Sequence, residues 1–132
     1  MSFAADISKF AKKAEVNADK YRRAVCLKLF SSVIMDTPVI TGRLRANWNT
    51  SVARPDLSVA DVPDDGMGKA AATGIAINKI EGNLGTINDT VFLTNNVKYA
   101  GYVEYGTPKF DGRFMVHRNV RRIKSLMNRK SK

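Results

Sequence analysis

The sequence is short of the residues that most often carry catalysis or covalent cross-links. Its 132 residues include one cysteine, one histidine and one tryptophan. The lone cysteine, Cys26, excludes an intrachain disulfide and predicts a reducing compartment, and its place in a helical pattern predicts a small buried side chain. Because His117 is the only histidine and no second cysteine exists, neither a histidine pair nor a thiolate pair can hold zinc. We therefore expect no metal and no cofactor.

Long apolar runs and catalytic motifs are also missing. No apolar run approaches the roughly 20 residues of a membrane span, and Asp6 interrupts the region where a secretory signal would lie. The glycines form neither a P-loop nor a dinucleotide fingerprint, and no serine sits in a nucleophile elbow. Glu104 lacks the companion acid, metal or electrophile of a general base, so we expect it to pair with Arg43 or Arg45. These absences predict a soluble, cytosolically synthesised protein that is not an enzyme.

Positive charge is abundant and unevenly placed. The net charge is +10, and residues 113–132 carry eight basic groups and no acidic one, whereas residues 51–112 carry more acids than bases. This balance predicts a polyanionic partner, an acidic protein partner, or copies of the chain stacked with complementary charge. With 44% apolar residues, the chain is expected to form a single domain over residues 1–132 that buries roughly two-thirds of its unfolded surface.

The first 36 residues predict one long amphipathic helix, from Ser2 to Asp36. Apolar residues recur at steps of three and four without glycine or proline, and Pro38 ends the pattern. Such a helix is about 50 Å long, more than this domain can cover alone. We therefore predict that its beginning packs on a neighbouring subunit. The predicted contact residues are Phe3, Ile7 and Phe10.

The centre of the chain predicts a strand and a flexible loop. Residues 44–52 alternate, with Leu44, Trp48 and their apolar neighbours on one face, which indicates a half-buried antiparallel strand with Trp48 in the core. Residues 54–68 hold two prolines and four aspartates and predict a flexible acidic loop without calcium-loop spacing. Three of these aspartates are predicted to take part in subunit contacts. They are Asp61, Asp64 and Asp65.

The second half predicts helix, strand and helix in turn. Residues 69–81 favour a short helix, and residues 90–94 form a β-branched and aromatic strand that ends at Asn95–Asn96. Tyr99 and nearby apolar residues then share one face of a helical turn, which Gly106 can end through a positive φ. We predict that this turn places its aromatic rings in the core.

Residues 114–128 predict a basic helix, followed by a disordered basic tail at residues 129–132. Its polar face could meet DNA or an acidic partner, or could be a solvated surface without a role. Too few large apolar residues and tryptophans lie opposite for a membrane-surface helix. The basic face comprises Arg118, Arg121, Arg122, Lys124 and Arg129.

Two motifs carry a resemblance to a known family. The first contains Thr37, Pro38, Thr41, Gly42, Leu44, Arg45, Asn47 and Trp48; the second contains Thr94, Asn95, Asn96, Tyr99, Ala100, Glu104, Tyr105 and Gly106. In this order and spacing, between a long helix and a basic helix, they resemble the head–tail connector, neck and tail-completion proteins of tailed bacteriophages, which include minor tail proteins of long-tailed phages. Residues 109–115 follow the family pattern only loosely.

The resemblance implies an α+β fold, in which a few-stranded antiparallel sheet is flanked by the long N-terminal and the basic C-terminal helix. It implies a structural virion protein that forms a ring, a hexamer or dodecamer, at the head–tail junction. Adaptors, stoppers and tail terminators act there, between the capsid-side connector and the tail-tube proteins, around the DNA channel, where non-specific DNA contact can occur. Both motifs would then be mainly structural. The alternatives are a basic nucleic-acid-binding protein and, less favoured, a small nuclease that uses Glu104 and the aspartates of the loop at residues 54–68.

Overall fold

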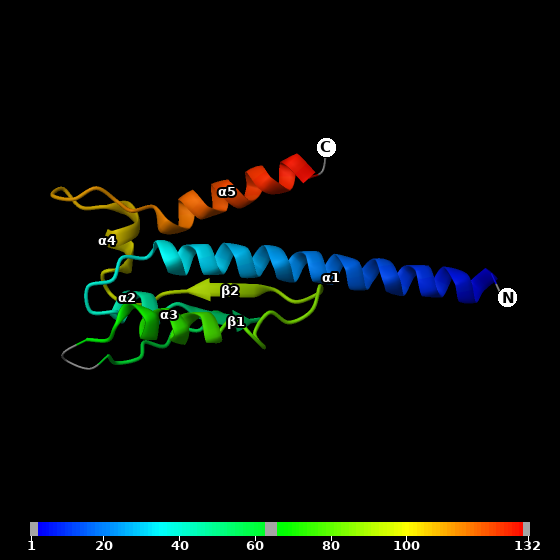
Figure 1. The fold of residues 1–132 in the computed structure, drawn as a ribbon, viewed down its shortest axis with the longest axis horizontal. Coiled ribbons are helices and arrows are strands. Elements are labelled where there is room, and N and C mark those ends of the chain that lie inside the picture. The colour runs from blue at the N-terminus through cyan, green and yellow to red at the C-terminus, as the bar shows by residue number, and fades with distance from the viewer. Residues whose placement is uncertain (1–2, 63–65, 131–132) are drawn as a thin grey trace.

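The chain folds as a mixed α+β structure. The computed structural model describes residues 3–62 and 66–130, and the side chains of residues 17–62 and 66–128 (Figure 1). Within that part, five helices accompany one two-stranded antiparallel sheet, which confirms the predicted fold class. The elements in chain order are α1 (Phe3–Asp36), α2 (Arg43–Ala46), β1 (Asn49–Val52), α3 (Lys69–Asn78), β2 (Val91–Thr94), α4 (Ala100–Tyr105) and α5 (Met115–Lys130).

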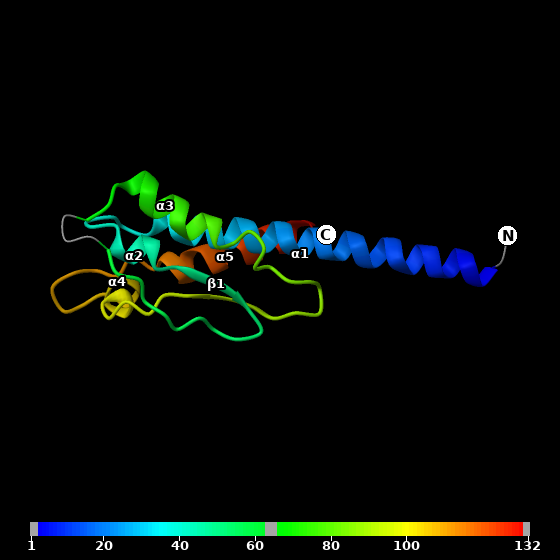
Figure 2. The same cartoon turned by 90° about the horizontal axis from the view of Figure 1, so that it is seen from below.

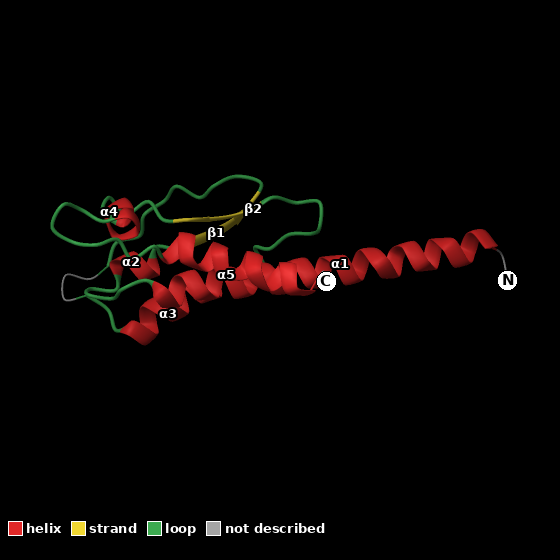
Figure 3. Cartoon of the chain, turned by 90° about the horizontal axis from the view of Figure 1, so that it is seen from above, coloured by secondary structure: helices red, strands yellow, loops and turns green. Residues whose placement is uncertain are grey.

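Helix α1 forms the long axis, and the other elements gather around its C-terminal half (Figure 1). Helices α5 and α3 each pack against α1, α2 packs on α3, and β1 pairs with β2. Seen from below, α4 and the loop that follows it lie at the end of the molecule opposite the N-terminus (Figure 2). Helices therefore make up most of the molecule, and the small sheet lies to one side of them (Figure 3).

The predicted long helix is confirmed as an element. It has no internal glycine or proline and ends at Asp36, since Pro38 restricts the preceding backbone and cannot donate a helical hydrogen bond. Its C-terminal turns contribute core residues, whereas its N-terminal half extends beyond every other element (Figure 1). Phe3, Ile7 and Phe10 belong to that half, and their side chains lie outside the described part of the chain.

One apolar core joins α1 to the rest of the domain. Partly buried side chains, Cys26 among them, pack around it, and Trp48 is buried as predicted. Within the described residues, no helix is long and apolar enough to cross a membrane. The core comprises Phe30, Val33, Ile34, Leu44, Trp48, Ala76, Ile80, Leu84, Val97 and Met115.

The predicted strand at residues 44–52 is correct only in its second half. Residues 43–46 form the helical turn α2, and β1 begins at Asn49, paired with β2 from Asn49↔Thr94 to Val52↔Val91. The alternation was ambiguous because Leu44 and Trp48 are four apart, a spacing that suits one face of a helical turn as well as one face of a strand. Arg45 lies on the face of the predicted strand opposite Leu44 and Trp48, which was expected to be exposed, but its side chain is buried.

Helix α4 has the predicted position but not the predicted packing. Its inner face contributes Ala100 and Val103 to the core periphery, whereas Tyr99 is 40% exposed and Tyr102 more so. The prediction that Tyr99 fills the core is therefore wrong. The helix is only six residues long and lies at the end of the molecule, so one side alone meets the core.

Helix α5 begins at Met115, one residue later than predicted, and continues to Lys130. It therefore includes two residues of the predicted disordered tail, and residues 131–132 lie outside the described part. Its buried positions are Met115, Asn119 and Ile123, which share one face at steps of four, while Met127 is largely exposed.

Candidate functional site

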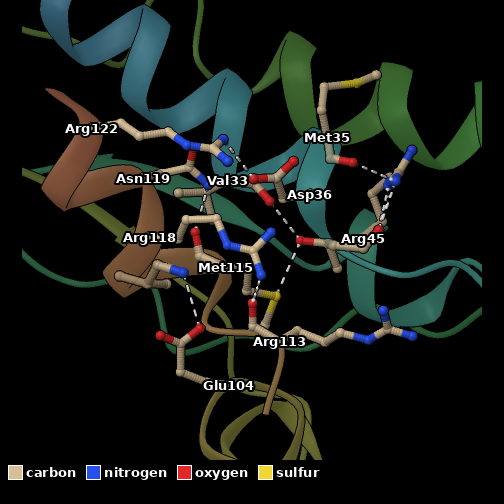
Figure 4. Close-up of polar contacts among 12 residues, drawn as sticks. Val33, Met35, Asp36, Arg45, Glu104, Arg113, Met115, Arg118, Asn119 and Arg122 are labelled. Atoms are coloured by element: carbon tan, nitrogen blue, oxygen red, sulfur yellow. Dashed lines mark hydrogen bonds and ion pairs between the residues drawn. The ribbon is translucent and has the colours of Figure 1, made fainter. Parts of the chain in front are cut away.

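The first motif is organised around Thr37, which is fully buried just after α1. Its hydroxyl donates to the Val33 carbonyl oxygen at 2.8 Å and accepts the Trp48 indole N–H at 2.8 Å. The sulfur of Met115 lies 3.4 Å from the same hydroxyl (Figure 4). One side chain thus joins the end of α1, the tryptophan and the beginning of α5.

Arg45 closes the C-terminus of α1. Its Nε and Nη2 donate to the Thr37 carbonyl oxygen at 3.1 and 2.6 Å, and Nη2 also donates to that of Met35 at 2.9 Å. Nη1 donates to Thr73 Oγ1 on α3 at 2.9 Å. A cation here satisfies carbonyls that the helix leaves unpaired and complements the negative end of its dipole. Burial lowers the pKa of Arg45, and the charge of Asp36 opposes that shift.

Gly42 allows the chain to turn between these elements. Its φ of +86° lies in the left-handed region, and a Cβ there would lie 2.9 Å from the Met67 carbonyl oxygen. Met67 N–H also donates to the Thr41 carbonyl oxygen at 2.8 Å. The first motif is therefore in direct contact with the end of the acidic loop.

The second motif binds the first one and the acidic loop. Asn95 Nδ2 donates to the Leu44 carbonyl oxygen at 2.7 Å. On either side of it, Thr94 Oγ1 and Asn96 Nδ2 donate to the Asp56 carbonyl oxygen at 2.6 and 3.2 Å. The asparagines predicted to make a turn thus also connect three segments of the chain.

Residues 54–62 form no helix or strand, but hydrogen bonds hold them against β1 and α2. Asn47 exchanges two bonds with Ala60, through Ala60 N–H at 2.7 Å and the Ala60 carbonyl oxygen at 3.1 Å. Asn49 Nδ2 donates to the Ser58 carbonyl oxygen at 3.0 Å. Lys79 Nζ in turn donates to Asn49 Oδ1 at 2.7 Å, and burial lowers the pKa of Lys79 against the raising effect of Asp56. The described part of the acidic loop is therefore anchored along its length.

Glu104 caps the N-terminus of α5. Its carboxylate accepts the backbone N–H groups of Val116 and His117 at 2.9 and 3.0 Å, and the His117 ring Nδ1 lies 2.5 Å from Oε2. Burial alone would raise the pKa of Glu104, but these hydrogen bonds outweigh it and lower the pKa below its ordinary value. The prediction of an ion pair with Arg43 or Arg45 is wrong, because the carboxylate points to α5 (Figure 4).

Asp36, the last residue of α1, binds the next turn of α5. Asn119 Nδ2 donates to its Oδ2 at 2.8 Å, and Arg122 Nη1 lies 3.6 Å from the same oxygen (Figure 4). Sequence reasoning missed this contact and the Glu104 cap. The first contact joins residues that are 83 positions apart in the sequence, and the second joins residues that are 12 apart. No local spacing in the sequence therefore signals either contact.

A hollow of about 620 Å³ lies at the end of the molecule occupied by α4. Its apolar lining is unusually exposed: Ile40 is 96% exposed and Phe110 74%. Arg113 and Arg118 lie on its rim, and Asp111 is the acidic residue in its lining. Exposed aromatic rings beside arginine are the composition that protein interfaces favour. We refer to this site as the aromatic hollow; its principal apolar residues are Ile40, Tyr99, Tyr102 and Phe110.

The predicted basic face of α5 is exposed at its described positions, Arg118, Arg121, Arg122 and Lys124, and the Arg129 side chain lies outside them. Of the predicted interface aspartates, Asp61 is exposed, while residues 64 and 65 are not described. Tyr105 lies on the outer side of α4 and its ring contacts that of His117 edge-on.

The search for metal ligands gave no group of three or more histidine, cysteine, aspartate or glutamate side chains among the described residues. Comparison of the chain with protein-family models, curated proteins and solved structures gave no match.

Proposed function

We propose that this protein is a structural component of a tailed-bacteriophage virion and forms a ring at the head–tail junction, in a neck, tail-completion or tail-terminator role. One observation carries the proposal: α1 extends beyond the body at one end (Figure 1), and the aromatic hollow, which is lined in part by α4, lies at the other end. Two different surfaces at opposite ends permit head-to-tail contacts between copies, and such contacts close into a ring when the rotation allows.

The internal bonding of the two motifs supports this proposal. The polar side chains of Thr37, Arg45, Asn95 and Glu104 are committed to backbone groups of the same chain. Side chains that hydrogen-bond to the backbone of their own chain stabilise the fold, and few of their polar atoms remain available to contact a substrate. Their resemblance to the neck and tail-completion motifs therefore concerns the scaffold, and contacts with the connector and tail-tube proteins would use other surfaces of the chain.

The exposed basic face of α5 fits a surface that lines a DNA channel. Arg121 and Lys124 are exposed and make no ion pair within the part of the chain that the structure describes. Such cations interact with phosphates without reading sequence, and their contribution weakens as salt rises. The same face favours the second candidate function, a nucleic-acid-binding protein that acts as a monomer or dimer.

Light scattering of the purified full chain, at low and high salt and with and without duplex DNA, tests both candidates. The ring proposal expects a closed assembly of six or more copies, a hexamer or dodecamer, whose mass does not depend on DNA. A monomer or dimer that binds duplex DNA tightly at low salt would overturn it and favour the second candidate. Arg121→Glu with Lys124→Glu should then abolish binding, whereas Lys98→Glu, a charge reversal elsewhere on the surface, should not.

A further inference from the structure

We propose that the segment Asp56–Asp61 of one copy binds in the aromatic hollow of a second copy. The contact would join neighbouring subunits, so this inference rests on the proposed ring. It assigns a specific partner to each of two exposed surfaces, and the occupant of the hollow is a second copy of this chain.

The segment presents apolar side chains on a fixed backbone. Leu57 is 70% exposed, and Val59 and Asp61 are also exposed. The carbonyl oxygens of the alternate residues 56, 58 and 60 are held by side chains of β2, β1 and the residues beside them. Because these bonds fix every second residue, binding would order little additional chain, and the entropic cost of association is correspondingly small.

The hollow offers the complementary apolar surface. Ile40 and Phe110 project from two loops and Tyr102 from α4, so side chains from three segments surround one opening. Exposed apolar residues scattered singly need no explanation, but several around one hollow indicate a binding site. Leucine and valine side chains supply the apolar area that would cover these rings.

Charge selects this pairing over the alternatives. The loop at residues 54–68 contains four aspartates and one arginine, whereas Arg113 and Arg118 border the hollow and the basic α5 follows directly. Asp61 of one copy would therefore meet a net positive rim, despite the presence of Asp111. Two hollows facing each other would instead oppose arginines, and like charges across an interface are disfavoured.

The positions of the two surfaces allow a head-to-tail contact. The segment runs along the outer side of β1 toward the end of the molecule where α4 lies (Figure 2). The hollow is lined by residues of α4 and of the neighbouring loops. Since the surfaces differ, one copy can use its segment for one neighbour and its hollow for another. This arrangement is heterologous, as a ring requires.

Cysteine cross-linking between two differently tagged copies tests the contact directly. In a Cys26→Ala background, one copy carries Leu57→Cys and the other Phe110→Cys; both positions are exposed, so neither change disturbs the core. Mild oxidation of the mixture should give a mixed disulfide at least tenfold more abundant than that from Glu81→Cys with Phe110→Cys. Glu81 is also exposed but lies outside the acidic loop. Equal yields in the two mixtures would overturn the contact.

Charge reversal provides a second test that leaves the apolar residues unchanged. Asp61→Arg or Arg113→Asp alone should weaken self-association at least tenfold, and the two changes in one chain should restore most of it. Glu81→Arg serves as the matched control and should leave association unchanged. Additive losses in the doubly changed chain would overturn the proposed pairing.

The experiments distinguish rejection of the proposed contact from rejection of the proposed ring. A closed ring of wild-type copies with no Leu57→Cys/Phe110→Cys disulfide would retain the ring and overturn the contact. A strong mixed disulfide in a protein whose mass indicates open pairs or chains would retain the contact and reject the ring.

Discussion

Asn95 and Leu44, 51 positions apart, are joined by a hydrogen bond of 2.7 Å from the asparagine amide to the leucine carbonyl oxygen. The bond connects the turn after β2 to the helical turn before β1, at the end of the sheet where both motifs lie. It links the two motifs directly. Because the donor and the acceptor belong to different motifs, neither motif alone predicts this hydrogen bond.

Asn95→Ala should destabilise the fold by about 1–3 kcal/mol, because it removes two hydrogen bonds of the partly buried amide. The Leu44 carbonyl oxygen would keep only the Asn47 N–H at 3.2 Å, and the Val97 N–H would lose the Asn95 side-chain oxygen as its acceptor. The matched control is Asn96→Ala, which removes a longer and exposed bond to Asp56 and should cost no more than about 0.5 kcal/mol. Urea unfolding followed by tryptophan fluorescence measures both, since Trp48 is buried. Equal losses of unfolding free energy in the two variants would show that the bond between the motifs contributes no more to stability than the exposed bond of Asn96.

Glu104→Gln should destabilise the protein by about 1–3 kcal/mol at neutral pH. The two carboxylate oxygens receive two backbone N–H groups and the His117 ring, and an amide would present its own N–H group to one of these donors. The loss of negative charge also removes a favourable interaction with the positive end of the α5 dipole. His117→Ala keeps both backbone donors and should cost less.

Acid should weaken this cap in the native protein. The pKa of Glu104 is lower in the folded state than its unfolded value of about 4.3, so its contribution is complete above that value and is lost as pH falls through the folded pKa. Unfolding free energies measured between pH 7 and pH 3 should therefore converge for the wild type and Glu104→Gln. A constant difference across this range would contradict the assignment of the cap to the carboxylate.

Gly42→Ala should destabilise the protein by about 1–3 kcal/mol, through a strained positive φ and the close approach to the Met67 backbone. Gly74→Ala is its control: Gly74 lies within α3, and a Cβ there would meet nothing within 4 Å. Removing a glycine from a helix interior should stabilise the fold by about 0.5–1 kcal/mol. Urea denaturation should therefore show a lower unfolding free energy than the wild type for Gly42→Ala and a higher one for Gly74→Ala.

Features with strong local signals could be predicted from the sequence. Helix α1 has a long uninterrupted period and a proline after its end, and β2 is a β-branched and aromatic run. The burial of Trp48 and the positive φ of Gly106 followed from the same kind of local chemistry. These features depend on neighbouring residues and not on the arrangement of distant segments.

Several of the errors involve residues outside the local segment. Arg45 is buried because two carbonyls at the end of α1 accept its guanidinium, and Glu104 faces α5 because the loop after α4 turns the chain back. Tyr99 is exposed because α4 lies at the end of the molecule. Charge and hydrophobicity indicate whether a side chain can be buried, but the topology decides which partners it meets.

Removal of residues 2–16 should separate folding from assembly. The N-terminal half of α1 extends beyond the other elements, while Arg22 and Arg23 still bind the carbonyl oxygens of Leu84 and Gly85 at 2.6 and 2.8 Å (Figure 1). The shortened chain should keep these bonds and the core, so its thermal unfolding midpoint should remain within a few degrees of the full chain's value. Its mass by light scattering should fall below that of the closed ring, because an uncovered helix of this length needs a neighbour, while the contact of Asp56–Asp61 with the aromatic hollow remains.

A longer deletion provides the control for this experiment. Removal of residues 2–26 also takes away the two arginines and should lower the unfolding midpoint clearly, which would show that the assay detects damage to the body. If the chain lacking residues 2–16 still formed a closed ring, the extended half of α1 could not be the subunit contact. Assembly would then depend on the body alone, and the aromatic hollow would be the first surface to change.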